Sequence, residues 1–179
     1  CTYSSVAGVC SDPTLIDWKA KDTEDYKFSG SPLNGDFNLG STSSYTGQQK
    51  LYGDVNGDGF ADLVWAYKNG SYVGWLLFTG KQDGGFNSPS QNSADAATAS
   101  PAYENFLLGD VNGDGKSDLV WIANTGTQLK RLVLLANAAG NSFSGQTMLV
   151  TTSASYIQNY SFLGDVNGDG RQDLIYAYV

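Results

Sequence analysis

The chain of 179 residues contains no histidine, only two cysteines and only 10 lysines and arginines. Without histidine, no side chain has an ordinary pKa near neutral pH, which disfavours general acid–base catalysis. The few basic residues form no stripe that could follow a nucleic-acid backbone. No apolar run approaches the roughly 20 residues of a membrane-spanning helix. We therefore expect no enzyme, no nucleic-acid partner and no membrane span.

The two cysteines, Cys1 and Cys10, lie close together near the N-terminus. In a chain with no other cysteine, such a pair favours a disulfide that closes a short loop in an oxidising compartment. Two free thiols are the alternative. We therefore expect a secreted, extracellular protein with a Cys1–Cys10 disulfide.

The acidic residues are concentrated in three places. The segment GDVNGDG occurs at 53–59, 109–115 and 164–170, and an aspartate follows each copy at the same distance. These three loops hold nine of the 18 acidic residues, and the rest of the chain is close to neutral. Carboxylates concentrated at equivalent places indicate three copies of one site.

Each loop is followed by a similar order of apolar runs and turns. DLVWAY begins at Asp62, DLVWIA at Asp118 and DLIYAY at Asp173. A turn and a second apolar run follow the first two. Short runs rich in Val, Leu, Trp and Tyr are typical of strands, and no segment keeps a helical apolar stripe. The sequence predicts four short antiparallel strands per unit, with the polar segment 93–100 as a loop.

The units recur about every 55 residues, and a period of this order is typical of propellers, solenoids and arrays. A weaker copy precedes them, because YKFSGSPLNGDFNL at 26–39 aligns with WLLFTGKQDGGFNS at 75–88. The predicted organisation is an N-terminal lead (1–13), a degenerate first unit (14–53), a second unit (54–109), a third unit (110–164), and a third loop with a closing strand (165–179).

The loops have the chemistry of a calcium site. Oxygen-bearing side chains fall at positions 1, 3, 5 and 9, and a glycine at position 6 allows the turn that brings the carbonyl of position 7 inward. A hard cation with six to eight oxygen ligands would relieve the repulsion between the carboxylates. The predicted ligands are Asp54, Asn56, Asp58, Phe60 and Asp62; Asp110, Asn112, Asp114, Lys116 and Asp118; and Asp165, Asn167, Asp169, Arg171 and Asp173.

Two other interpretations of the loops are weaker. Asp, Asn and Gly form turns without metal, but three identical loops that share the ninth-position aspartate are poorly explained by turns alone. An EF-hand or dockerin loop needs a carboxylate at position 12. That position holds Trp65, Trp121 or Tyr176 here, and the following residues favour a strand.

The pattern Asp-x-Asn-x-Asp-Gly-x-x-Asp-Leu resembles the FG-GAP/VCBS repeat of integrin-α-like calcium-binding β-propellers. All three loops match at every position, and FSGSP at 28–32 loosely resembles the segment that names the family. The resemblance covers about residues 14–179. It implies an all-β, β-propeller-type array of four-stranded antiparallel blades, about three blades per chain, with one Ca²⁺ in each of the three loops.

Three blades are too few for a ring, because propellers usually close with about four to eight. The chain is therefore part of a longer protein, or two chains complete a ring as a homo-oligomer, or the blades form an open stack.

Members of this family serve as adhesion modules, lectins and appended domains of secreted hydrolases. We expect a calcium-binding module for carbohydrate, since aromatic faces beside Asn and Asp make sugar sites. Trp18 and Trp75 are the candidate ligand residues, because they lack aromatic counterparts in the matching unit, whereas Trp65, Trp121 and Tyr176 recur and favour packing. The alternative is a protein-interaction or adhesion module, or a non-catalytic accessory domain of a larger secreted hydrolase.

Overall fold

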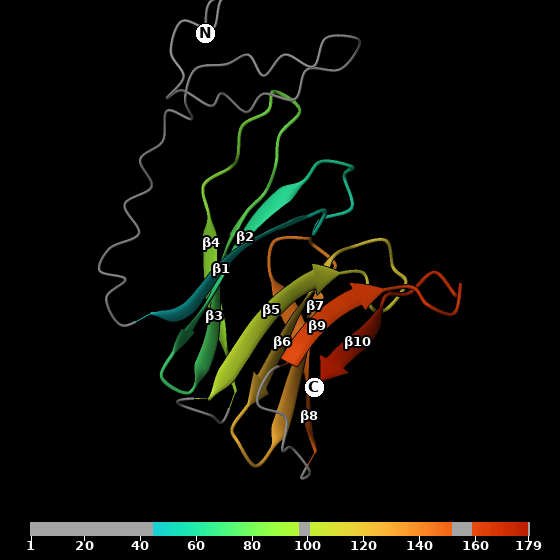
Figure 1. Ribbon diagram of the computed structural model, residues 1–179. Coiled ribbons are helices and arrows are strands. Elements are labelled where there is room, and N and C mark those ends of the chain that lie inside the picture. The colour runs from blue at the N-terminus through green and yellow to red at the C-terminus, as the bar shows by residue number, and fades with distance from the viewer. Residues whose placement is uncertain (1–44, 97–100, 152–158, 179) are drawn as a thin grey trace, which may run out of the picture.

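The computed structural model describes residues 45–96, 101–151 and 159–178, which form ten strands and no helix (Figure 1). All strand pairs are antiparallel. Sheet 1 contains β1 (Thr46–Gly53), β2 (Asp62–Asn69), β3 (Tyr72–Phe78) and β4 (Ser90–Asp95). Sheet 2 contains β5 (Tyr103–Gly109), β6 (Asp118–Asn124), β7 (Leu129–Ala136) and β8 (Phe143–Thr151). Sheet 3 contains β9 (Asn159–Gly164) and β10 (Asp173–Tyr178).

The strands follow one another in space in the order of the sequence, so each four-stranded sheet is a meander. In every sheet the first strand ends at the glycine that opens the acidic loop, and the second strand begins at the ninth-position aspartate. Gly53 pairs with Asp62, Gly109 with Asp118, and Gly164 with Asp173. Each sheet therefore takes its first strand from the end of the preceding sequence unit.

The polar segment predicted as a loop at 93–100 is partly strand. Ser93–Asp95 belong to β4, which pairs with β3 through its backbone and has mostly exposed side chains. A strand at the outer edge of a sheet needs no apolar side chains for its ladder hydrogen bonds, so its sequence lacks the usual apolar signal.

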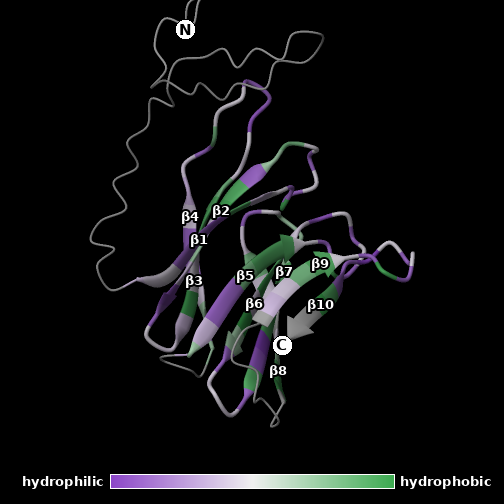
Figure 2. Ribbon diagram, in the orientation of Figure 1, coloured by the Kyte–Doolittle hydropathy of each residue, from purple (hydrophilic) through white to green (hydrophobic). Residues whose placement is uncertain are grey.

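The sheets stand side by side, with β1 next to β5 and β5 next to β9 (Figure 1). Val64, Ala66 and Trp75 of sheet 1 belong to one buried cluster with Leu119 and Trp121 of sheet 2. A second cluster joins sheet 2 to Leu163 and Leu174 of sheet 3. Because sheet 2 is covered on both faces, β6 is buried along its whole length, and between its polar ends, Asp118 and Asn124, its sequence is apolar rather than alternating (Figure 2).

Charged groups are also buried between sheets 1 and 2. Lys68 is fully buried, and its Nζ lies 5.0 Å from the ring centroid of Trp121. The Trp121 indole donates a hydrogen bond to a Glu104 carboxylate oxygen at 3.1 Å. Burial lowers the pKa of Lys68 and raises that of Glu104, and the opposite charges of the two groups partly offset both shifts. The predicted packing role of Trp121 is confirmed, whereas Trp65 at the same place in sheet 1 is only half-buried.

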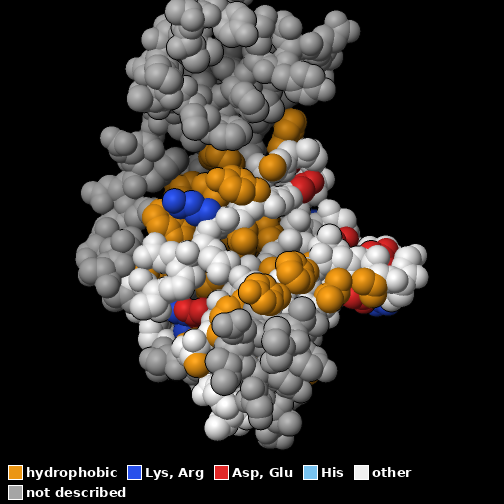
Figure 3. Space-filling view, in the orientation of Figure 1, with side chains coloured by type: hydrophobic (Ala, Val, Ile, Leu, Met, Phe, Trp, Pro, Cys, Tyr) orange, Lys and Arg blue, Asp and Glu red, His pale blue; other side chains and the backbone are white. Residues whose placement is uncertain are grey.

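Sheet 3 presents an apolar surface to solvent. Tyr160, Phe162 and Ile175 are among its exposed side chains, with Tyr160 57% and Phe162 53% exposed. Figure 3 shows hydrophobic side chains gathered over β9. The described residues include no helix that is long and apolar enough to cross a membrane.

Candidate metal centres

The three acidic loops link the first and second strands of the three sheets. The glycine at position 6 has a positive φ in each, at 85° for Gly59 and 81° for Gly115 and Gly170. This left-handed conformation is strained for other residues and explains the glycine. The expected sharp turn is present at the same place in every loop.

The aspartate at position 1 organises the loop backbone. One carboxylate oxygen of Asp54 accepts hydrogen bonds from the Gly57 and Asp58 amides at 2.6 and 3.2 Å. Its other oxygen accepts from the Gly59 amide at 2.8 Å. Asp110 and Asp165 make the same three bonds in their own loops. The carboxylate therefore lies inside the curl of the chain.

The side chains at positions 3 and 5 contact each other. In the first loop, the Asn56 amide donates to Asp58 Oδ2 at 2.8 Å, and Asn56 Oδ1 accepts from the Asp58 backbone amide at 2.9 Å. Asp58 Oδ1 accepts from the Phe60 amide at 2.8 Å. The corresponding bonds occur in the other two loops. Three oxygen-bearing side chains are thus gathered around each loop tip.

The ninth-position aspartate has a structural role that the sequence reasoning missed. Asp62 is fully buried and accepts hydrogen bonds from the Val55 amide at 2.8 Å and the Gly80 amide at 2.7 Å. Asp118 is bound in the same way by Val111 and Ala136, at 3.1 and 2.8 Å. The carboxylate therefore connects its loop to the end of the third strand. The i to i+18 spacing of these partners is not visible as a sequence motif.

The loop carboxylates influence one another electrostatically. Burial raises the pKa of Asp62, the two backbone hydrogen bonds lower it, and the charges of Asp58 and Asp54 raise it further. The pKa of Asp118 is raised for the same reasons. Among the described residues, no lysine or arginine forms an ion pair with the carboxylates of the first loop.

The third loop differs from the first in this respect. The Arg171 guanidinium donates to Asp169 Oδ2 at 2.8 Å. This hydrogen bond lowers the pKa of the Asp169 carboxyl to about 2. The side chains of Arg171 and Asp169 are 57% and 34% exposed, so the pair adds little to stability.

The donor set fits a hard cation better than a soft one. Each loop offers carboxylate, amide and backbone carbonyl oxygens, and no sulfur or imidazole. No group of three His, Cys, Asp or Glu side chains that could hold a metal ion is present within the described ranges. The loops match calcium in the type of donor atoms they carry.

The loops form a row along one end of the sheets. The Ser117 amide donates to the Asp54 carbonyl at 2.6 Å, and the Gln172 amide donates to the Asp110 carbonyl at 2.7 Å. Each loop is thus tied to the preceding one by the same backbone bond.

The residue at position 7 contributes its side chain as well as its backbone. Lys116 packs over Gly57 of the preceding loop, where a β-carbon would lie 3.5 Å from the lysine Cγ. Its Nζ donates to the carbonyls of Asn137 and Ala138 at 3.3 and 3.0 Å. Arg171 covers Gly113 in the same way. The side chain at position 7 therefore makes contacts in the second and third loops although its identity varies between the loops.

The predicted ligand residue Trp75 is a core residue. It is 2% exposed and packs edge-on against Phe143, with 5.6 Å between ring centroids. Its ring faces cannot reach a ligand, so the exposure that a ligand role requires is absent. Trp18, Cys1 and Cys10 lie outside the described residues, as does most of the degenerate first unit (14–53).

The fold and the loops define a class: an all-β protein built from repeats of an acidic loop and a meander of short strands. A family model for the FG-GAP-like repeat matches residues 54–121 and 110–176. The two matches together span most of the chain, and the chain belongs to the FG-GAP-like repeat family. Comparison with curated proteins and with solved structures gave no match.

Proposed function

We propose that this protein is a non-catalytic, calcium-organised binding module that acts outside the cell. The observation that carries the proposal is the repetition of one donor set in three loops with the same hydrogen bonds. In each loop the residues that would bind Ca²⁺ are the side chains at positions 1, 3, 5 and 9 and the carbonyl at position 7. Calcium bound there would neutralise carboxylates that now repel one another.

The sheets are proposed to be blades of a β-propeller-type array. The adjacency of β1, β5 and β9 supports this, because the first strands of neighbouring blades lie beside each other around a propeller axis. Side chains reinforce the contacts: Gln49 accepts from the Phe106 amide at 3.3 Å, and Asn105 donates to Ser161 Oγ at 2.9 Å. A ring would need further blades, from a longer chain or from a second copy.

Carbohydrate is the proposed ligand. The described part of sheet 1 carries several tyrosines beside uncharged amide side chains, which is the combination that neutral sugars require. Two of the acids outside the loops, among the residues that the structure describes, have structural partners: Glu104 binds the Trp121 indole, and Asp83 accepts from the Gly85 amide at 3.0 Å. These partners favour a binding module over a glycosidase, which needs a pair of free carboxyl groups.

Protein interaction is the second candidate function. The exposed Tyr160, Phe162 and Ile175 on sheet 3 favour it, since contiguous exposed apolar side chains mark interaction surfaces. The same surface would suit a further blade or a second copy of the chain.

Calcium removal tests the first part of the proposal. A ligand present at about 1,000 times its dissociation constant stabilises the folded state by about 4 kcal/mol per site. We expect chelation to lower the melting temperature by on the order of 10 °C. An identical melting curve in excess calcium and in chelator would contradict a calcium-organised fold, and excess magnesium serves as the control for ionic strength.

Native mass spectrometry tests the number of Ca²⁺ ions bound per chain. We expect three Ca²⁺ ions per chain, and one fewer in each of the single variants Asp58→Asn, Asp114→Asn and Asp169→Asn. The matched control is Asp83→Asn, which changes the same charge outside the loops. Loss of the same number of ions in the control would show that the binding is not located in the loops.

A further inference from the structure

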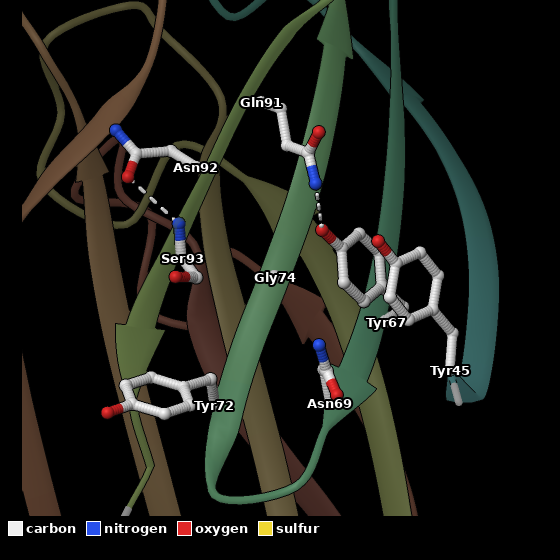
Figure 4. A pocket seen from close by; sticks show the side chains of 8 residues that line it. All are labelled: Tyr45, Tyr67, Asn69, Tyr72, Gly74, Gln91, Asn92 and Ser93. Atoms are coloured by element: carbon white, nitrogen blue, oxygen red, sulfur yellow. Dashed lines mark hydrogen bonds between the residues drawn. The ribbon is translucent and has the colours of Figure 1, made fainter. Parts of the chain in front are cut away.

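A hollow lies on the face of sheet 1 that points away from sheet 2, beside the turn between β2 and β3 (Figure 4). Its volume is about 190 Å³. Gly74 forms its floor, and the ring of Tyr67 leans across this glycine, so that a side chain added at Gly74 would collide with the ring. The absence of a side chain at Gly74 therefore leaves the space that the Tyr67 ring occupies.

Tyrosines form one side of the hollow and its rim. Tyr45 stacks on Tyr67 with 4.0 Å between centroids and 13° between ring planes. Tyr67 is nearly fully buried beneath this stack, whereas Tyr72, at the start of β3, is 51% exposed. Tyr67 in the stack is therefore covered, and Tyr72 at the rim is accessible. The exposed ring of Tyr72 suits the apolar face of a ring-shaped ligand.

Polar side chains line the remainder. Gln91 donates from its amide nitrogen to the Tyr67 hydroxyl at 3.0 Å, which fixes the amide and leaves its carbonyl oxygen as an acceptor. Asn69 and Ser93 point toward the same space (Figure 4). Amides and hydroxyls both donate and accept hydrogen bonds, as sugar hydroxyls do. The described residues around the hollow include no charged side chain, so an uncharged ligand fits it best.

Sheet 2 offers an internal comparison, because the strand registers are equivalent. Tyr67 pairs with Gly74 in sheet 1, and Ala123 pairs with Lys130 in sheet 2. Gln91 and Ser93 correspond to Met148 and Val150. The equivalent place in sheet 2 thus has a long side chain in place of the glycine and apolar residues on the outer strand. Sheet 2 has the same strand order without a glycine at this place, so the fold of the repeat does not depend on the hollow. The rim of the hollow is polar, whereas the faces that pack between sheets are apolar.

We propose that this hollow is a saccharide site that takes one neutral pyranose ring. The ring would lie against Tyr72 at the rim, and its hydroxyls would bond to Gln91, Asn69 and Ser93. This inference rests on the proposed carbohydrate-binding function and gives it a location. A saccharide site would also explain why sheet 1 has Gly74, Gln91 and Ser93 where sheet 2 has Lys130, Met148 and Val150.

Isothermal titration calorimetry and amide chemical-shift mapping of the calcium-loaded chain test the site. The probes are the methyl glycosides of glucose, galactose, mannose, fucose and N-acetylglucosamine. We expect at least one to bind, with shifts confined to residues 69–74 and 91–93. Absence of binding by every glycoside would overturn both the carbohydrate function and this site.

Variants separate the site from the function. Tyr72→Ala should weaken binding by at least about tenfold, which corresponds to about 1.4 kcal/mol. Tyr72→Phe keeps the ring and should bind within about threefold of the unsubstituted protein, since stacking is retained. Ser93→Phe places a ring in the hollow on an exposed edge strand and should abolish binding. Tyr52→Ala, an exposed tyrosine of β1 outside the hollow, is the matched control and should bind normally.

The outcomes distinguish the two proposals. If a glycoside binds but Tyr72→Ala and Ser93→Phe leave its affinity unchanged, the carbohydrate function stands and the location is wrong. Each variant is first shown to retain its calcium count and its melting temperature. If Tyr72→Ala or Ser93→Phe fails this check, the remaining variant and the chemical-shift map of the unsubstituted protein still decide where the glycoside binds.

Discussion

Sheets 1 and 2 share their strand order, their acidic loop and most of their strand register, yet their faces differ. Sheet 2 is covered by sheet 1 on one side and by sheet 3 on the other, and β6 is buried throughout. Sheet 1 has a covered face with Trp75 and another that carries Trp65, Tyr67 and the hollow at Gly74. The repeat therefore fixes backbone geometry, whereas each face adapts to what lies against it.

The two equivalent tryptophans provide the largest expected contrast. Trp121 is fully buried and its indole is hydrogen-bonded to Glu104, so Trp121→Ala leaves a large cavity and an unpaired carboxylate. We expect a loss of about 3–5 kcal/mol of unfolding free energy. Trp65 is half-buried, and Trp65→Ala should cost about 1–2 kcal/mol. Denaturant unfolding measures both, and equal losses would mean that the two faces are equally packed.

The ninth-position aspartates provide the next contrast. Asp118 accepts two backbone hydrogen bonds in a buried place, so Asp118→Ala leaves two amides without partners and should cost about 3 kcal/mol. Asp173 is less buried and accepts one such bond, from the Val166 amide at 3.1 Å. Asp173→Ala should cost about 1 kcal/mol.

Both aspartate variants are compared by denaturant unfolding in chelator, so that metal affinity does not enter the difference. A larger loss for Asp173→Ala than for Asp118→Ala would show that the connection to the third strand has little energetic importance.

The side chains at position 7 provide the smallest contrast. Lys116→Met keeps the packing over Gly57 and removes the bonds to the carbonyls of Asn137 and Ala138, so we expect a loss of about 1 kcal/mol. Arg171→Met removes an exposed pair with Asp169 and should leave unfolding unchanged within error. A destabilisation by Arg171→Met that matches that of Lys116→Met would show that the exposed Arg171–Asp169 pair stabilises the fold as much as the Lys116 bonds to the β7–β8 turn.

Much of the fold could be predicted because its signals are local. The loop residues lie within nine positions of one another, and the conformation of a short turn depends mainly on its own glycines and aspartates. The strands β2, β6 and β10 could be predicted because an apolar run follows each ninth-position aspartate. Four strands per unit were predicted, but the end of the outer strand β4, Ser93–Asp95, was assigned to a loop because its residues are polar and its strong signal is pairing with β3.

The sequence by itself determined the all-β class, the repeat and the residues that would hold calcium, since each depends on neighbours along the chain. Only the tertiary structure decided which of two identically placed tryptophans is buried, that Trp75 lies in the core, and that Lys116 reaches a preceding loop. It also brought Tyr45, Tyr67 and Gln91 together around Gly74. These properties depend on residues that are distant in sequence and become neighbours only when the sheets pack.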